Sequence, residues 1–319
     1  MIWMPFLCLG TGFLISLKGL SVTVLKRINL IVNAALIVLM FTIGANIGIN
    51  DSVMQNLRSI GINCVIVSLS VIAGSVIMVV LVEKVALPLQ ALQDKLYEQS
   101  LSVGSEVDLE REKDKKTSPL IWIMPVSIIG GVLAGYFLAS EKQSGILDFT
   151  LLFSLILLYT SVGISLGTNR GVFGYIKVLG FRVIYISGAI FAGSLAGGFL
   201  SGIVLGLPMH ISVISAAGMS YYSITGAYMT SAYGIEAGTY GFVVNVMREF
   251  FTVVLLPLLI RISKGSPIAG GGAGCMDTML IPVTKFVGPE LGLVALITGV
   301  ILTFAVPFVL PILYGFFSV

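Results

Sequence analysis

The chain has 319 residues, of which 57% are hydrophobic and only 10% are charged, and its formal net charge is +3. Soluble domains carry roughly 25% charged residues, so the composition excludes an ordinary soluble domain and predicts an all-α polytopic membrane protein. The three cysteines have neither the spacing of a metal site nor that of a disulfide framework.

Six ordinary spans are expected before residue 206, because a helical span needs about 20 mainly apolar residues. They lie at about 2–17, 28–49, 60–82, 119–139, 147–167 and 183–205. The first has no basic leader and no small-residue cleavage site, which favours a span over a signal peptide. The charged segment 83–118 mixes both signs without apolar periodicity, so it is predicted to be a solvated cytoplasmic linker.

An internal repeat relates the two halves of this six-span region, residues 1–205. Its copies, residues 41–50 and 160–169, align Gly44 with Gly163, Gly48 with Gly167 and Asn50 with Asn169. Three spans separate the copies, so the halves are predicted to be inverted, in a 3+3 arrangement. Close helix packing is the favoured interpretation of these Gly-x-x-x-Gly patterns, and a role in a site is the alternative.

A second repeat, offset by 54 residues, fills residues 206–319. It pairs Gly218 with Gly272, Gly234 with Gly288, Glu236 with Glu290, Gly238 with Gly292 and Pro257 with Pro311. Each copy has a stretch rich in Gly, Ser and Thr (206–233 or 264–287), followed by a long apolar span (about 238–260 or 290–317). Each stretch is too interrupted for one straight helix, so it is either a broken span or a re-entrant hairpin of two half-helices.

The distribution of Lys and Arg favours hairpins. With the N-terminus outside and both stretches as hairpins, most basic residues fall in the cytoplasm, whereas full crossings would move Arg261 and Lys264 outside. We therefore expect about eight transmembrane helices plus two oppositely oriented hairpins in inverted repeats, with both termini outside the cytoplasm. Duplicated interrupted segments indicate a transporter's substrate site, so residues 206–319 are predicted to be the transport core.

Asp277 is the sharpest candidate site residue, because it places a carboxylate at membrane depth within the second break. A charge there costs about 2.5–3.5 kcal/mol, and it persists only where it is paired, protonated or facing water. Met276 and Thr278 belong to the same break. The structural alternative for Asp277 is that it caps the second half-helix.

The first break presents Tyr221, Tyr222 and Ser223, and Ser223 occupies the repeat position of Asp277. Hydroxyls and aromatic ring faces could together bind an ammonium group. The alternative is ordinary packing within the hairpin.

The span 238–260 contains Asn245, Arg248 and Glu249. Asn245 and Glu249 are four residues apart and share a helix face, so they are expected to face the cavity, with Arg248 supplying a compensating charge. The alternative for Arg248 is an internal ion pair or a contact between helices. Asp51, expected as the first residue of a loop after the second span, is either solvated or part of the site.

An enzyme is not expected, because the sequence has no His-Glu-x-x-His motif, no hydrolase triad and no phosphate loop. It predicts no cofactor, no metal site and no nucleic-acid partner. A channel or sensor without coupled transport is the alternative outside the transporter class.

The chain resembles the bacterial lysine exporter family (LysO), within the superfamily of cation/proton antiporters and bile-acid-type transporters. The matching patterns are Tyr222-Ser223, Asn245-Val246-Met247-Arg248-Glu249 and Cys275-Met276-Asp277, where Cys275 replaces the usual Ser. The resemblance covers nearly the whole chain, except the 83–118 segment. It implies eight spans, both termini outside, and two essential intramembrane acids that map onto Asp51 and Asp277.

The resemblance also implies a secondary active transporter in the bacterial inner membrane that exports L-lysine and close cationic analogues by proton antiport. A Na⁺/H⁺ antiporter or an organic-acid transporter of the same superfamily is the alternative. The expected partners are L-lysine, protons or Na⁺, and the lipid bilayer, and a homodimer is left open.

Overall fold

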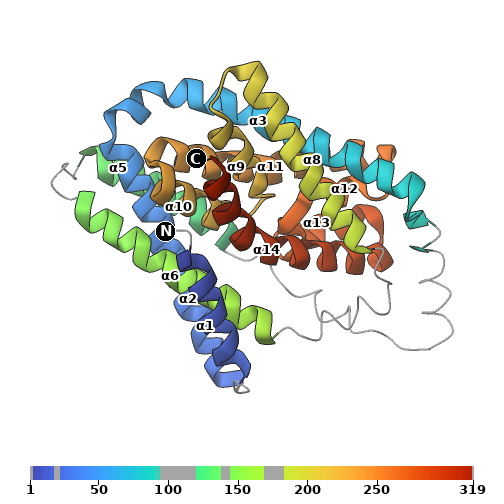
Figure 1. Ribbon diagram of the computed structural model, residues 1–319, viewed down its shortest axis with the longest axis horizontal. Coiled ribbons are helices and arrows are strands. Elements are labelled where there is room, and N and C mark those ends of the chain that lie inside the picture. The colour runs from blue at the N-terminus through green and yellow to red at the C-terminus, as the bar shows by residue number, and fades with distance from the viewer. Residues whose placement is uncertain are drawn as a thin grey trace.

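The computed structural model describes residues 3–17, 22–90, 92–93, 120–137, 144–168 and 183–317, and every regular element within these ranges is helical (Figure 1). The elements are α1 (Trp3–Leu17), α2 (Val22–Ile49), α3 (Asp51–Val85), α5 (Leu120–Phe137), α6 (Ser144–Thr168), α8 (Val183–Leu205), α9 (Met209–Ala217), α10 (Tyr222–Tyr233), α11 (Ile235–Ile262), α12 (Ser266–Gly271), the 3-10 helix η3 (Gly272–Met276), α13 (Leu280–Val287) and α14 (Pro289–Phe317). The predicted all-α class is confirmed.

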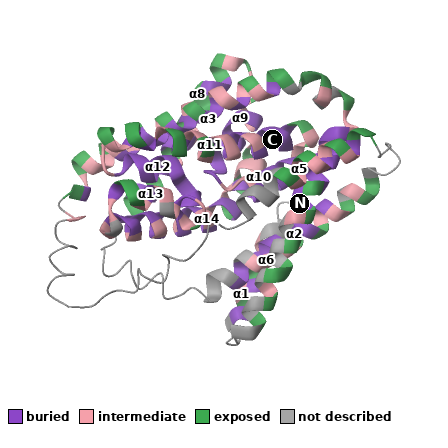
Figure 2. Ribbon diagram, turned by 180° about the vertical axis from the view of Figure 1, so that it is seen from behind, coloured by how far each residue is buried: buried purple, intermediate pink, exposed green. Residues whose placement is uncertain are grey.

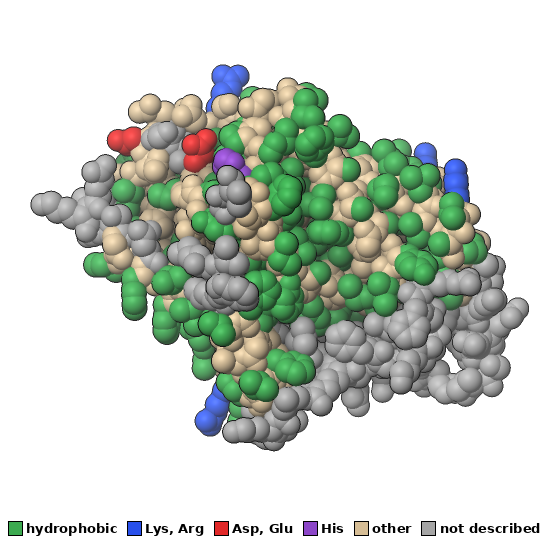
Figure 3. Space-filling view, in the orientation of Figure 1, with side chains coloured by type: hydrophobic (Ala, Val, Ile, Leu, Met, Phe, Trp, Pro, Cys, Tyr) green, Lys and Arg blue, Asp and Glu red, His purple; other side chains and the backbone are tan. Residues whose placement is uncertain are grey.

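Within the described ranges, four helices are long and apolar enough to cross a membrane: Arg58–Val85 within α3, Val183–Leu205, Ile235–Ile262 and Glu290–Phe317 within α14. Shorter apolar segments lie at Phe6–Ser16, Ile37–Ile49, Val126–Phe137 and Gly145–Ser161. Figure 3 shows hydrophobic side chains over much of the face, while the Lys and Arg side chains stand at its margins. This distribution is typical of a protein that sits in a bilayer.

Helices of the first 205 residues pack in pairs, α1 on α6, α2 on α5 and α3 on α8. Glycines let these backbones approach closely: a Cβ on Gly44 would strike the carbonyl oxygen of Ile128, and one on Gly131 would strike that of Phe41. No larger residue fits such a contact unless the helices separate. The packing interpretation of the Gly44 pattern is therefore confirmed.

The start of the 83–118 segment is not a solvated linker. Glu83 belongs to the last turn of α3, and its Oε1 accepts hydrogen bonds from the Gly265 amide (2.6 Å) and the Ser263 hydroxyl (2.9 Å). Gln93 donates to Glu290 Oε2 at 3.2 Å. The linker prediction is wrong for residues 83–93, because the Glu83 and Gln93 side chains bind the two ends of the second interrupted stretch. Residues 94–118 lie outside the described ranges.

The two interrupted stretches lie inside the protein. All six residues of α12 are buried, as are seven of the nine residues of α9. Figure 2 shows this concentration of buried residues around the C-terminal helices. Broken backbone at membrane depth is tolerated only where protein surrounds it or it lines a cavity, and both stretches satisfy that requirement.

The two copies of the 54-residue repeat share their local geometry. Gly234 and Gly288 have φ angles of 92° and 95°, which glycine adopts without steric cost. Their amides donate to the carbonyls of Thr230 (3.0 Å) and Thr284 (2.9 Å), respectively. In each copy, therefore, glycine ends the interrupted stretch in the same way and starts the following long helix.

Candidate functional site

The two helix breaks of the C-terminal region touch each other. The amide of Ala273 donates to the carbonyl of Met219 at 2.8 Å, and these residues occupy the same repeat position. A Cβ on Gly272 would lie 2.6 Å from that carbonyl oxygen, so this contact requires glycine. The breaks therefore form one central junction.

Asn245 of α11 holds the first break from behind. Met219 and Ser220 have left-handed φ angles of 47° and 79°, which are strained for residues with a side chain. Asn245 Oδ1 accepts from the Ser220 amide at 2.7 Å, while its Nδ2 donates to the carbonyls of Ser215 and Gly241, both at 2.8 Å. The prediction that Asn245 faces the cavity is wrong, because its amide satisfies buried backbone groups.

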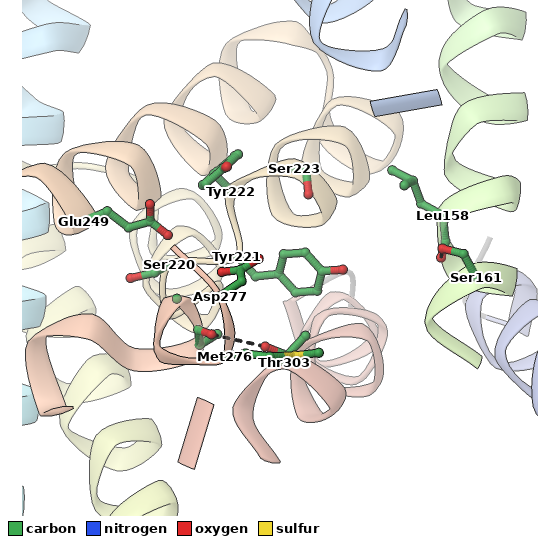
Figure 4. Close-up of a pocket in the computed structure, with 12 residues that line it drawn as sticks. Leu158, Ser161, Ser220, Tyr221, Tyr222, Ser223, Glu249, Met276, Asp277 and Thr303 are labelled. Atoms are coloured by element: carbon green, nitrogen blue, oxygen red, sulfur yellow. Dashed lines mark hydrogen bonds between the residues drawn. The ribbon is translucent and has the colours of Figure 1, made fainter. Parts of the chain in front are cut away.

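A cavity of about 170 Å³ lies against this junction (Figure 4). It is lined by Leu158 and Ser161 of α6, Ser220, Tyr221, Tyr222 and Ser223 of the first break and α10, Glu249 of α11, Ala273, Gly274, Met276 and Asp277 of the second break, and Thr303 of α14. A buried water needs a cavity of at least about 10–15 Å³, so this one has room for several waters or a small molecule.

Two carboxylates share this cavity. Asp277 is exposed to it, and Glu249 is half-buried at its wall. Thr278 joins them, because its hydroxyl donates to Glu249 Oε1 at 3.1 Å and its amide donates to Asp277 Oδ1. None of the described residues that line the cavity is Lys, Arg or His. The cavity wall is thus suited to a cation.

Four of the other predicted residues of the breaks line the cavity, and Thr278 does not. Tyr221, Tyr222, Ser223 and Met276 all line the cavity, so the structure brings both helix breaks to one place. The ring of Tyr222 packs edge-on against Phe242, with centroids 5.6 Å apart. Thr278 positions carboxylates and does not itself line the cavity.

Arg248 is fully buried and is not among the cavity-lining residues. Its Nε donates to the Gly270 carbonyl (3.0 Å), its Nη1 to Ser194 Oγ (2.8 Å), and its Nη2 to Ser75 Oγ (3.2 Å) and the Ala269 carbonyl (2.9 Å). No carboxylate is among these acceptors. Its hydrogen bonds match the alternative of a contact between helices. Its charge also attracts the neighbouring Glu249 carboxylate, as the predicted compensating charge would.

Asp51 is exposed and is the first residue of α3, so its assignment to a loop is wrong. It is absent from the cavity wall. Leu158 and Ser161 of α6, in contrast, line the cavity although neither was a predicted site residue. The signal for Ser161 was its place in the repeated glycine-rich segment 160–169, which was interpreted mainly as helix packing.

Comparison with known protein families gives a match to most of this chain. A family model described as lysine exporter LysO matches residues 6–95 and 126–314. The match includes residues 83–95, so the expectation that the whole 83–118 segment departs from the family is wrong for its first part.

Two relatives agree with this match. The lysine exporter LysO of Escherichia coli (strain K12) is 27% identical over 307 residues, covering 96% of this chain and 95% of that protein. A Haemophilus influenzae protein provisionally described as a lysine exporter is 32% identical over 168 residues, covering 52% of this chain and 83% of that protein. No solved structure matches the chain.

Proposed function

We propose that this chain, which belongs to the lysine exporter LysO family, exports L-lysine and close cationic analogues from the bacterial cytoplasm by secondary active transport. The observation that carries the proposal is the placement of Asp277 and Glu249 on one cavity whose described lining residues include no Lys, Arg or His. Such a cavity attracts ammonium groups and disfavours an organic acid.

Proton antiport follows from competition for the same carboxylates. A carboxylate oxygen that holds a proton cannot also form an ion pair with an ammonium group. On the cytoplasmic side, lysine would displace protons from Asp277 and Glu249, and on the other side protons would displace lysine. Thr278 supports this exchange, because its hydroxyl carries no charge and holds the Glu249 carboxylate by a hydrogen bond.

The proposed architecture is alternating access between two inverted repeats, with eight spans and two hairpins that enter from opposite sides of the inner membrane. Three observations support it: the shared geometry of Gly234 and Gly288, the contact between Ala273 and Met219, and the position of the cavity at that contact. Movement of one break relative to the other would change the side to which the cavity opens.

Both termini are proposed to lie outside the cytoplasm, because that arrangement puts most Lys and Arg inside. Several basic residues on which this depends lie outside the described ranges: Lys18, Arg170, Lys177 and Arg182. Labelling a cysteine placed at residue 2 and one placed at residue 318 in intact cells, with a thiol reagent that does not cross membranes, checks the orientation. Labelling of neither position would contradict it.

The transport proposal is tested with purified protein in proteoliposomes that contain a pH-sensitive dye. We expect radioactive lysine to accumulate against its gradient when an opposing proton gradient is imposed, and lysine to drive proton movement without Na⁺. Proton flux that requires Na⁺ and ignores lysine would identify a Na⁺/H⁺ antiporter. Lysine flux that only follows its own gradient would identify a channel or uncoupled carrier.

A further inference from the structure

We propose that the cavity contains a separate subsite for the α-carboxylate of the substrate, formed by the hydroxyl of Ser220 and the N-terminus of α10. This inference rests on the proposed function, because it takes the transported molecule to be an amino acid. It assigns Ser220 a role in specificity, distinct from the cation-binding role of Asp277 and Glu249.

Ser220 lines the cavity, and its hydroxyl is buried without a hydrogen-bond partner, since the residue is only 3% exposed. A buried hydroxyl without a partner costs free energy, and most such groups in folded proteins are paired. Figure 4 shows Ser220 between Glu249 and Asp277, at the point where the two breaks meet. The hydroxyl therefore has an unused hydrogen-bonding capacity next to the cavity, which a carboxylate bound there would satisfy.

The backbone of Ser220 is also held in a strained conformation. Its φ of 79° is one that glycine adopts freely and that other residues rarely adopt. The Asn245 side chain holds the Ser220 amide in this conformation. Strain of this kind persists where the surrounding structure enforces it, and it concentrates at ligand-binding sites.

The N-terminus of α10 opens beside Ser220. The residue before the helix, Tyr221, makes no side-chain capping bond, and the first turn contains no acidic residue. The amides of Ser223 and Ile224 have no acceptor within the helix, because they belong to its first turn. Amides of a first turn carry partial positive charge and bind anions such as carboxylates.

The charges of the cavity then match those of lysine. At neutral pH, L-lysine carries two ammonium groups and one carboxylate. The cavity offers two carboxylates, on Asp277 and Glu249, and one position that binds anions, at Ser220 and the start of α10. A diamine of the same length without a carboxylate, 1,5-diaminopentane, would satisfy only the two acids.

The test compares lysine with 1,5-diaminopentane in proteoliposomes. For the wild type, we expect a lower KM for lysine than for the diamine. Ser220→Gly keeps the backbone conformation and removes the hydroxyl, so we expect the lysine KM to rise about tenfold, the loss of one hydrogen bond to a charged group, with the diamine KM within about twofold. Ser220→Ala serves as the second variant.

Ser187→Ala is the matched control, because Ser187 in α8 is also buried with an unpaired hydroxyl but does not line the cavity. It should leave the ratio of the two KM values unchanged. Equal rises for lysine and the diamine in both Ser220 variants, or a wild type that does not distinguish them, would overturn the subsite. A wild type that transports neither compound would instead overturn the proposed function.

Discussion

The hydroxyls of Ser75 and Ser194 lie 3.0 Å apart, although 119 positions separate them in the chain. The same spacing relates Gly44 to Gly163, so the two serines occupy equivalent positions of the sequence repeat within residues 1–205. Both accept hydrogen bonds from Arg248. The guanidinium of α11 thus joins α3 and α8 to α12 at their point of contact.

Replacement of Arg248 by methionine should destabilise the protein. It leaves the carbonyls of Ala269 and Gly270 without this donor in a buried place, at a cost of about 1–3 kcal/mol for each group. The measurement is the midpoint of thermal unfolding in detergent. Arg261→Met is the control, because Arg261 lies in the same helix but is exposed; similar shifts for the two variants would contradict the joining role of Arg248.

Asp277→Asn should abolish lysine export and lysine binding without unfolding the protein, because it removes a cavity carboxylate and keeps the side-chain shape. Asp51→Asn should leave lysine binding intact, since Asp51 is absent from the cavity wall. Binding is measured by calorimetry on purified variants, and export by efflux from loaded vesicles. Normal efflux by Asp277→Asn would refute its assignment, and loss of binding in Asp51→Asn would place that residue in the site.

Thr278→Val should raise the lysine KM about tenfold, since it removes a hydrogen bond to the Glu249 carboxylate with little change in shape. Thr278→Ser retains the hydroxyl and is the control. Initial rates of lysine transport over a range of concentrations give both KM values. If the valine variant transports like the serine variant, the Thr278 hydroxyl does not position Glu249.

Gly131→Ala should separate α5 from α2, because its Cβ would strike the carbonyl oxygen of Phe41. The neighbouring Gly130 is a matched control, since a Cβ there meets nothing within 4 Å. Alanine at Gly130 should be neutral or stabilising by up to about 1 kcal/mol, the usual difference between the two residues in a helix. Thermal unfolding of both variants is the test, and equal midpoints would show that α2 and α5 can move apart without cost.

Much of the fold could be predicted from the sequence. The predicted interrupted stretches end at Tyr233 and Val287, where α10 and α13 end, because glycine at positive φ stops a helix locally. Long apolar runs specify spanning helices by the same local chemistry, and the repeat indicated the equivalence of the two breaks. Asp277 could be identified because a carboxylate in an apolar, broken segment needs a compensating environment.

The roles of individual side chains depended on the tertiary structure. Asn245 and Arg248 lie close to Glu249 in sequence, but only Glu249 reaches the cavity, because the packing of α11 against the broken stretches decides which face each residue meets. Ser161 lines the cavity from a helix distant in the chain. By itself, the sequence determined which segments are apolar helices and where those helices break. Contacts between distant segments decided what each polar side chain faces, because no local pattern encodes the rotation of a helix against its neighbours.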